Sequence, residues 1–96
     1  MIDDLYDLVL NDNGFLSKLR CQNEFDEQIY LNIKSTLQHL VDEWKTTESI
    51  PPKALLIIIE LIDFLSGGSK FLNEEDKIKV EDANLEIKDI IYSLYM

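Results

Sequence analysis

The strongest constraint on the fold is the apolar segment at residues 52–65, which reads PKALLIIIELIDFL. Runs of isoleucine and leucine also suit a buried strand. However, this segment is as long as a helix, starts at prolines and is followed by Gly67 and Gly68, and that pattern favours a helix. After Lys53, only Glu60 and Asp63 interrupt its apolar surface. A helix that is apolar nearly all round is surrounded by other helices or lies in an interface.

Helical spacing of apolar residues also marks residues 2–10, residues 23–45 and the segment from residue 73 to the C-terminus. The NDNG sequence at 11–14 is expected to end the first helix, because Asn and Gly tolerate the left-handed backbone found at helix ends. Residues 15–20 are expected to add one or two helical turns. Asn73, followed three residues later by Asp76, resembles a capping box at the start of the last helix.

These segments predict an all-α fold in a single domain over residues 1–96: a compact bundle of four main helices with an apolar central third helix. Phe25 and Trp44 belong to the apolar stripe of the second helix, and Val80 and Ala83 to that of the fourth. The expected core consists of Leu5, Val9, Ile29, Ile33, Leu37, Leu40, Leu55, Ile58, Ile59, Ile62, Ile87, Ile90, Ile91 and Leu94.

Acidic residues outnumber basic ones, with 19 Asp and Glu against 9 Lys and Arg, and the formal net charge is −10. Nucleic acids and anionic lipids bind proteins mainly through Lys and Arg. We therefore expect neither a nucleic acid nor a membrane as partner. The charge favours a basic protein partner, and the alternative is that it only keeps a small domain soluble.

Three features bear on the cellular compartment. Asp3 and Asp4 occupy the place where a secretory signal carries basic residues. The longest apolar run, residues 54–59, is far shorter than the roughly 20 residues that span a bilayer. Cys21 is the single cysteine, which excludes an intramolecular disulfide and fits a reducing compartment. Together these features predict a cytoplasmic protein.

Two groups of residues suggest a metal site, and neither is complete. If Gly14 held the sixth position of a calcium loop, Val9 and Arg20 would hold the first and twelfth, where neither side chain binds calcium. His39 and Glu43 share a helix face, but a metal site needs more ligands than these two. We expect no metal and no cofactor, with the NDNG sequence a turn and His39 a partly exposed structural residue.

Catalytic arrangements are also incomplete. Cys21 lies beside Arg20, but a cysteine nucleophile needs a base within reach, so a packing role is expected for it. Glu60 and Asp63 have no cation nearby in the sequence and are expected to face solvent or to form a salt bridge. The GGSK sequence at 67–70 lacks the Walker spacing, and a helix cap explains its glycines. These observations predict a protein that is not an enzyme.

Carboxylates form two notable clusters, which we predict to be the partner-binding residues. Near the end of the second helix, acidic residues flank Trp44, and on the fourth helix a second set repeats at i, i+4 and i+7. Such carboxylates attract a basic protein and raise its association rate. Four tyrosines, Tyr6, Tyr30, Tyr92 and Tyr95, are expected on surfaces outside the core stripes. The predicted partner-binding residues are Asp42, Glu43, Trp44, Glu48, Asp82, Glu86 and Asp89.

A short, strongly acidic, apparently all-helical chain with the stripe Asp82, Glu86 and Asp89 resembles small bacterial immunity proteins that neutralise toxin nucleases, including contact-dependent inhibition and colicin-type systems. The Tyr-Tyr-Pro segment of the colicin DNase immunity proteins has no counterpart here, so no family residue is carried over. The resemblance implies a non-enzymatic antitoxin that binds and neutralises a basic toxin domain. The alternatives are a helical protein–protein interaction or homodimerisation module, and an acidic mimic of DNA.

Overall fold

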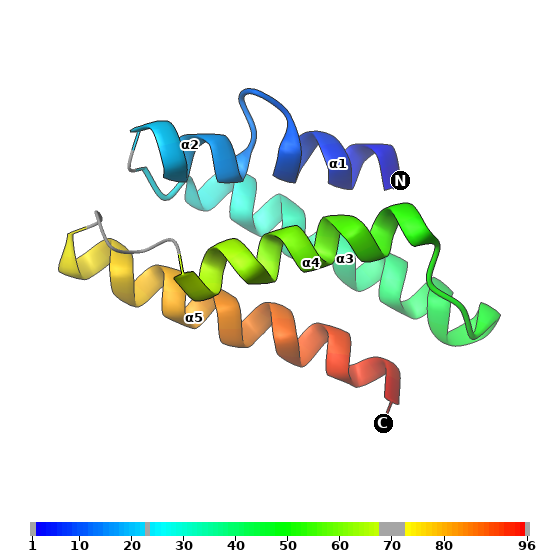
Figure 1. The fold of residues 1–96 in the computed structure, drawn as a ribbon. Coiled ribbons are helices and arrows are strands. Elements are labelled where there is room, and N and C mark those ends of the chain that lie inside the picture. The colour runs from blue at the N-terminus through cyan, green and yellow to red at the C-terminus, as the bar shows by residue number, and fades with distance from the viewer. Residues whose placement is uncertain (1, 23, 68–72, 96) are drawn as a thin grey trace.

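The computed structural model describes residues 2–22, 24–67 and 73–95, and within these ranges every regular element is helical (Figure 1). The all-α prediction is confirmed, with α2 as the expected extra turns after the first helix. Asn23, where we expected the second helix to begin, and most of the GGSK sequence lie outside the described residues. The elements are α1 (Ile2–Leu10), α2 (Phe15–Gln22), α3 (Glu27–Thr47), α4 (Pro52–Gly67), α5 (Glu74–Tyr92) and the 3₁₀ turn η1 (Ser93–Tyr95).

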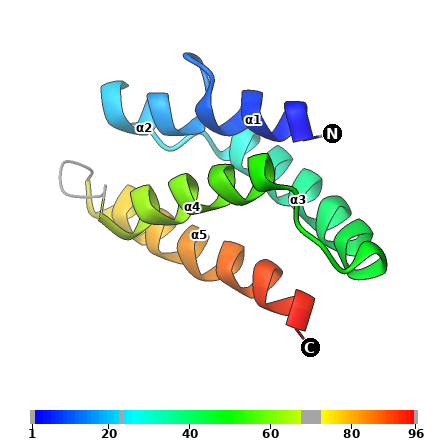
Figure 2. The same cartoon turned by 45° about the vertical axis from the view of Figure 1, so that its right-hand side comes forward.

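Helices α1, α3, α4 and α5 form a bundle in which α3 and α4 occupy opposite corners. α1 contacts both α3 and α4, and α5 also contacts both. α3, α4 and α5 run alternately in opposite directions, and α2 continues from α1 over one end of the bundle (Figures 1 and 2). The Cα radius of gyration of 13.0 Å is that of a compact domain of about this length. Because α4 occupies a corner of the bundle, one of its sides faces away from the other helices.

The start of α3 is fixed by a cap and by aromatic packing. Asp26 has extended backbone angles, and its side chain accepts a 3.0 Å hydrogen bond from the backbone N–H of Ile29. Phe25 precedes the cap and packs on Tyr30 of the first turn, with 5.5 Å between ring centroids. This pair is a hydrophobic staple, which sets the angle at which the chain enters a helix. For this reason α3 begins at Glu27, later than the sequence pattern predicted.

The turn at 11–14 ends α1 as expected, but our reason for its glycine was wrong. No glycine in the described ranges has a positive φ angle. A Cβ atom at Gly14 would lie 2.9 Å from the Asn11 carbonyl oxygen and 3.0 Å from that of Leu8. Any larger residue would therefore displace the backbone of α1. Gly14 allows a close approach of two chain segments and does not supply a left-handed conformation.

Half of the residues that we expected in the core are buried, and two are exposed. Leu55 and Ile59 on α4 are 46 % and 54 % exposed, so their predicted burial was wrong. An all-apolar helix has no polar face to show which side is turned outward, and the bundle leaves one side of α4 uncovered. Ile29, Ile62, Ile90, Ile91 and Leu94 are partly buried. The confirmed core residues are Leu5, Val9, Ile33, Leu37, Leu40, Ile58 and Ile87.

Helix α2 contributes much of the core that the sequence pattern did not reveal. Phe15, Leu16 and Leu19 are buried, and the Phe15 ring meets that of Phe25 edge-on at 5.2 Å. The Lys18 ammonium donates a 2.7 Å hydrogen bond to the Asp26 carboxylate, which ties α2 to the start of α3. Helix α2 therefore closes one end of the bundle.

Candidate functional site

The predicted acidic stripe on α5 lies on one face of the helix. Asp82 and Asp89 are exposed, and neither has an ion-pair partner among the residues that the structure describes. Glu86 lies between them and accepts a short hydrogen bond from the Lys34 ammonium of α3. Two of the three predicted carboxylates thus remain available to a partner, and the third is partly neutralised by this protein's own lysine.

The second predicted cluster is spread over separate surfaces. Glu43 lines a hollow beside α1 that also includes Asp3, whereas Glu48 lines a different hollow beside η1. Asp42 is exposed on α3. Helical geometry explains the separation, because consecutive residues point about 100° apart around the axis. A single flat interface cannot use all three carboxylates equally.

Trp44 requires a correction, because the structure places it in the core. Its side chain is only 4 % exposed. A ring at this depth offers a partner little contact area, although aromatic anchors normally supply much of it. Trp44 instead packs the end of α3 into the core of the bundle.

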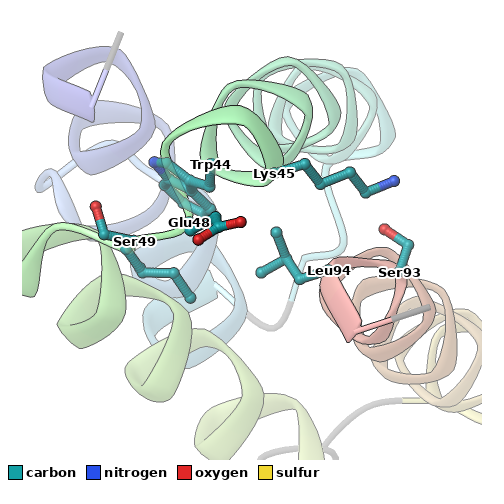
Figure 3. Close-up of a pocket in the computed structure, with 7 residues that line it drawn as sticks. Trp44, Lys45, Glu48, Ser49, Ser93 and Leu94 are labelled. Atoms are coloured by element: carbon teal, nitrogen blue, oxygen red, sulfur yellow. The ribbon is translucent and has the colours of Figure 1, made fainter.

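A hollow of about 660 Å³ opens where the α3–α4 connection meets η1 (Figure 3). Glu48 and Leu94 point into it from opposite sides, and Lys45 extends along its rim (Figure 3). Glu48 has a left-handed backbone, with φ 57°, and its N–H donates to the Trp44 carbonyl at 2.7 Å. Glycine is the usual residue at such a helix end. Glu48 therefore has a backbone conformation that is unfavourable for a residue other than glycine, and its carboxylate lies in the hollow (Figure 3).

A second, smaller depression of about 240 Å³ runs between α3 and α5, and we call it the α3–α5 groove. Two ion pairs cross it: Lys34 with Glu86, and Lys79 with Glu27, whose Nζ–Oε1 distance is 2.8 Å. The hydrogen bond to Glu27 raises the pKa of Lys79 above its usual value. The lining residues are Phe25, Glu27, Tyr30, Leu31, Lys34, Lys79, Asp82 and Glu86.

Tyr30 lies at the floor of this groove, and its expected surface position was wrong. It is 7 % exposed, and its buried hydroxyl has no hydrogen-bond partner within residues 2–22, 24–67 and 73–95. Burial raises the pKa of this hydroxyl, and the negative charge of Glu86 raises it further. The hydroxyl and the Glu86 carboxylate are close, but they do not meet the geometry of a hydrogen bond. Tyr6 and Tyr92 are exposed, as expected. The side chain of Tyr95 lies outside the described residues.

The sequence pattern did not identify the groove, although each half of it has a local signal. Tyr30 and Lys34 are four residues apart on α3, and so are Asp82 and Glu86 on α5, which places each pair on one helix face. The spacing along one helix does not reveal which other helix packs against it. Only the pairing of α3 with α5 brings the two halves together.

The polar side chains that were considered for metal binding or catalysis lie on the surface of the bundle. No group of three or more metal-ligating side chains occurs within residues 2–22, 24–67 and 73–95, and His39 is exposed. Glu60 and Asp63 face solvent, as expected. Cys21 is exposed and free, so the packing role that we expected for it was wrong.

Among the described helices, none combines the length and the apolar character needed to cross a bilayer. Comparisons with protein-family models, with curated proteins and with solved structures find no match to this chain.

Proposed function

We propose that this protein is a non-enzymatic, cytoplasmic immunity protein that binds and neutralises a basic toxin domain of the nuclease class. The proposal rests on one observation: in a chain with a net charge of −10, Asp82 and Asp89 are exposed and form no ion pair with any lysine or arginine among the described residues. A nuclease must bind phosphates, so its cleft carries basic residues. Carboxylates placed where phosphates would lie compete for the same cations.

Electrostatic steering supports the proposal on kinetic grounds. A cell that makes its own toxin needs rapid capture, and complementary surface charge raises association rates by roughly 10- to 1,000-fold. The α5 stripe suits this role because its carboxylates repeat on one face of a long, regular helix. The lone Cys21 fits the reducing compartment in which such an inhibitor would meet its toxin.

The test uses the protein encoded beside this chain's gene. The double variant Asp82→Lys/Asp89→Lys should fail to protect cells that express this neighbour, whereas Glu60→Lys/Asp63→Lys should protect them as well as the wild type does. The control changes the net charge equally, but on the exposed side of α4. Growth of the co-expressing cells is the measurement, with thermal melts to show that both variants fold. A neighbour that is neither basic nor toxic, or equal protection by both variants, would contradict the proposal.

A second candidate function is a helical homodimerisation module, and the exposed face of α4 favours it. Leu55, Leu56 and Ile59 are each about half exposed, which is unusual for three large apolar side chains on one helix. Sedimentation equilibrium distinguishes the candidates. A mass that stays at 11.2 kDa over a hundredfold range of concentration eliminates the homodimer.

A further inference from the structure

The floor of the α3–α5 groove contains a buried hydroxyl that lies near the Glu86 carboxylate without completing a hydrogen bond to it. The Tyr30 side chain is more than nine-tenths buried, and its hydroxyl makes no hydrogen bond to any residue that the structure describes. Leaving a buried polar group unpaired is unfavourable, so native proteins seldom do this without a reason. A ligand that brings an N–H group into the groove would supply the missing partner.

The walls of the groove favour a cation. Asp82 is exposed and has no ion-pair partner in the described ranges, and Glu86 contacts Lys34 through only one of its two oxygens. A carboxylate accepts several hydrogen bonds, so Glu86 retains capacity for a further donor. The Lys34 ammonium also lies 5.7 Å from the centre of the Tyr30 ring, which shows that this ring already borders a positive charge.

The dimensions and the aromatic lining narrow the choice of cation. A volume of about 240 Å³ is below the roughly 300–1,000 Å³ of most small-molecule pockets, so the groove accommodates one side chain. A guanidinium is planar, stacks on aromatic rings and offers several N–H donors in a rigid fork. It can therefore bond a carboxylate and the Tyr30 hydroxyl together, whereas an ammonium is a compact charge of the kind that Lys34 and Lys79 already provide.

We infer that the α3–α5 groove binds an arginine side chain of the basic partner, with Asp82 and Glu86 accepting from the guanidinium and Tyr30 supplying a third acceptor. This inference rests on the proposed function for the existence of such a partner, and it adds the residue type that the partner presents. It also gives a role to the orphaned hydroxyl, which the acidic stripe alone leaves unexplained.

The probes are Nα-acetyl-arginine amide and its lysine analogue, each titrated into the ¹⁵N- and ¹³C-labelled protein and followed by NMR. Arginine amide should shift the resonances of Phe25, Tyr30 and Asp82 at concentrations several-fold lower than lysine amide requires. Tyr30→Phe should weaken arginine binding about tenfold, the factor expected for one hydrogen bond to a charged group. Asp82→Asn should weaken it at least as much, whereas Asp63→Asn, which removes an exposed carboxylate of α4, should leave it unchanged.

Equal effects of both amides, shifts spread evenly over the acidic surface, or full binding by Tyr30→Phe would overturn the inference. The proposed function is tested separately. If the neighbouring toxin binds Tyr30→Phe and Asp82→Asn as tightly as the wild type, the groove is not the arginine site, although the immunity role stands. If arginine amide binds in the groove but the neighbouring protein is neither basic nor toxic, the groove inference stands and the immunity role fails.

Discussion

The outer face of α4 and the α3–α5 groove are both open to solvent, yet large apolar side chains are prominent on the first and ion pairs on the second. On α4, Leu55, Leu56 and Ile59 are exposed without an adjoining helix to cover them. In the groove, ion pairs and an orphaned hydroxyl surround aromatic walls. The acidic excess therefore does not coat the bundle evenly. One surface suits an apolar partner such as a second copy of the chain, and the other suits a cation.

The largest expected effect separates the two sides of α4. Ile58 is 4 % exposed and its neighbour Ile59 is 54 % exposed. Ile58→Asp places an unpaired carboxylate in the core and should cost more than about 4 kcal/mol, enough to abolish a cooperative thermal melt followed by circular dichroism. Ile59→Asp should melt within a few degrees of the wild type. If the two variants unfolded alike, the outer face of α4 would be buried in solution, as a dimer requires.

The next effect concerns the support of the groove at the start of α3. Asp26→Ala removes both the helix cap and the bond to Lys18, and should cost about 2 kcal/mol in urea denaturation at pH 7. Asn73→Ala removes only the cap of α5 and should cost about 1 kcal/mol. Equal losses for the two variants would show that Lys18 contributes nothing to this junction.

Comparing the wild type with Asp26→Ala at low pH gives a further test of this junction. The hydrogen bond from Lys18 holds the pKa of Asp26 below its usual value of 3.8. Because the folded state binds this proton less readily than the unfolded state, the stabilisation is present above pH 3.8 and is lost as the pH falls below it. The stability difference between the wild type and Asp26→Ala should therefore shrink at pH 3. A difference that stays constant down to pH 3 would exclude an ionised Asp26 as its source.

The smallest expected effect tests the orphaned hydroxyl. Tyr30→Phe removes a buried polar group without a partner and should stabilise the free protein by about 1 kcal/mol at pH 7. Burial raises the pKa of this hydroxyl, so above pH 10 the unfolded chain releases the proton while the folded chain keeps it. Wild-type stability should therefore fall further than that of Tyr30→Phe as the pH rises above 10. A destabilised Tyr30→Phe would mean that the hydroxyl has a partner in solution.

Local rules predicted the helices and the cap at Asn73, because these depend on residues within one or two turns of each other. They also placed Asp82 and Glu86 on one face. The same rules misjudged Leu55 and Ile59, since an all-apolar helix contains no information about which side will be covered. They missed the buried state of Tyr30, which depends on rings from α2 and on the segment before α3.

The two predicted acidic clusters show the same limit. Asp82, Glu86 and Asp89 repeat with the period of the helix and remain on one face, whereas Asp42, Glu43 and Glu48 are near in sequence but point in different directions. Helical periodicity therefore predicted which carboxylates share one face, whereas proximity along the chain did not. Neither pattern shows which carboxylates a lysine from another helix will neutralise, as Lys34 neutralises Glu86.

The most direct test of the account is the association rate of this protein with the protein encoded by the adjacent gene, the proposed toxin, measured by stopped flow at 50 and 300 mM NaCl. If the α5 stripe steers the encounter, the wild-type rate should fall at least tenfold between the two salt concentrations, and Asp82→Asn/Asp89→Asn should remove most of that salt dependence. A wild-type rate that does not change with salt, or a variant with the wild-type salt dependence, would contradict the claim that these carboxylates recognise a basic partner.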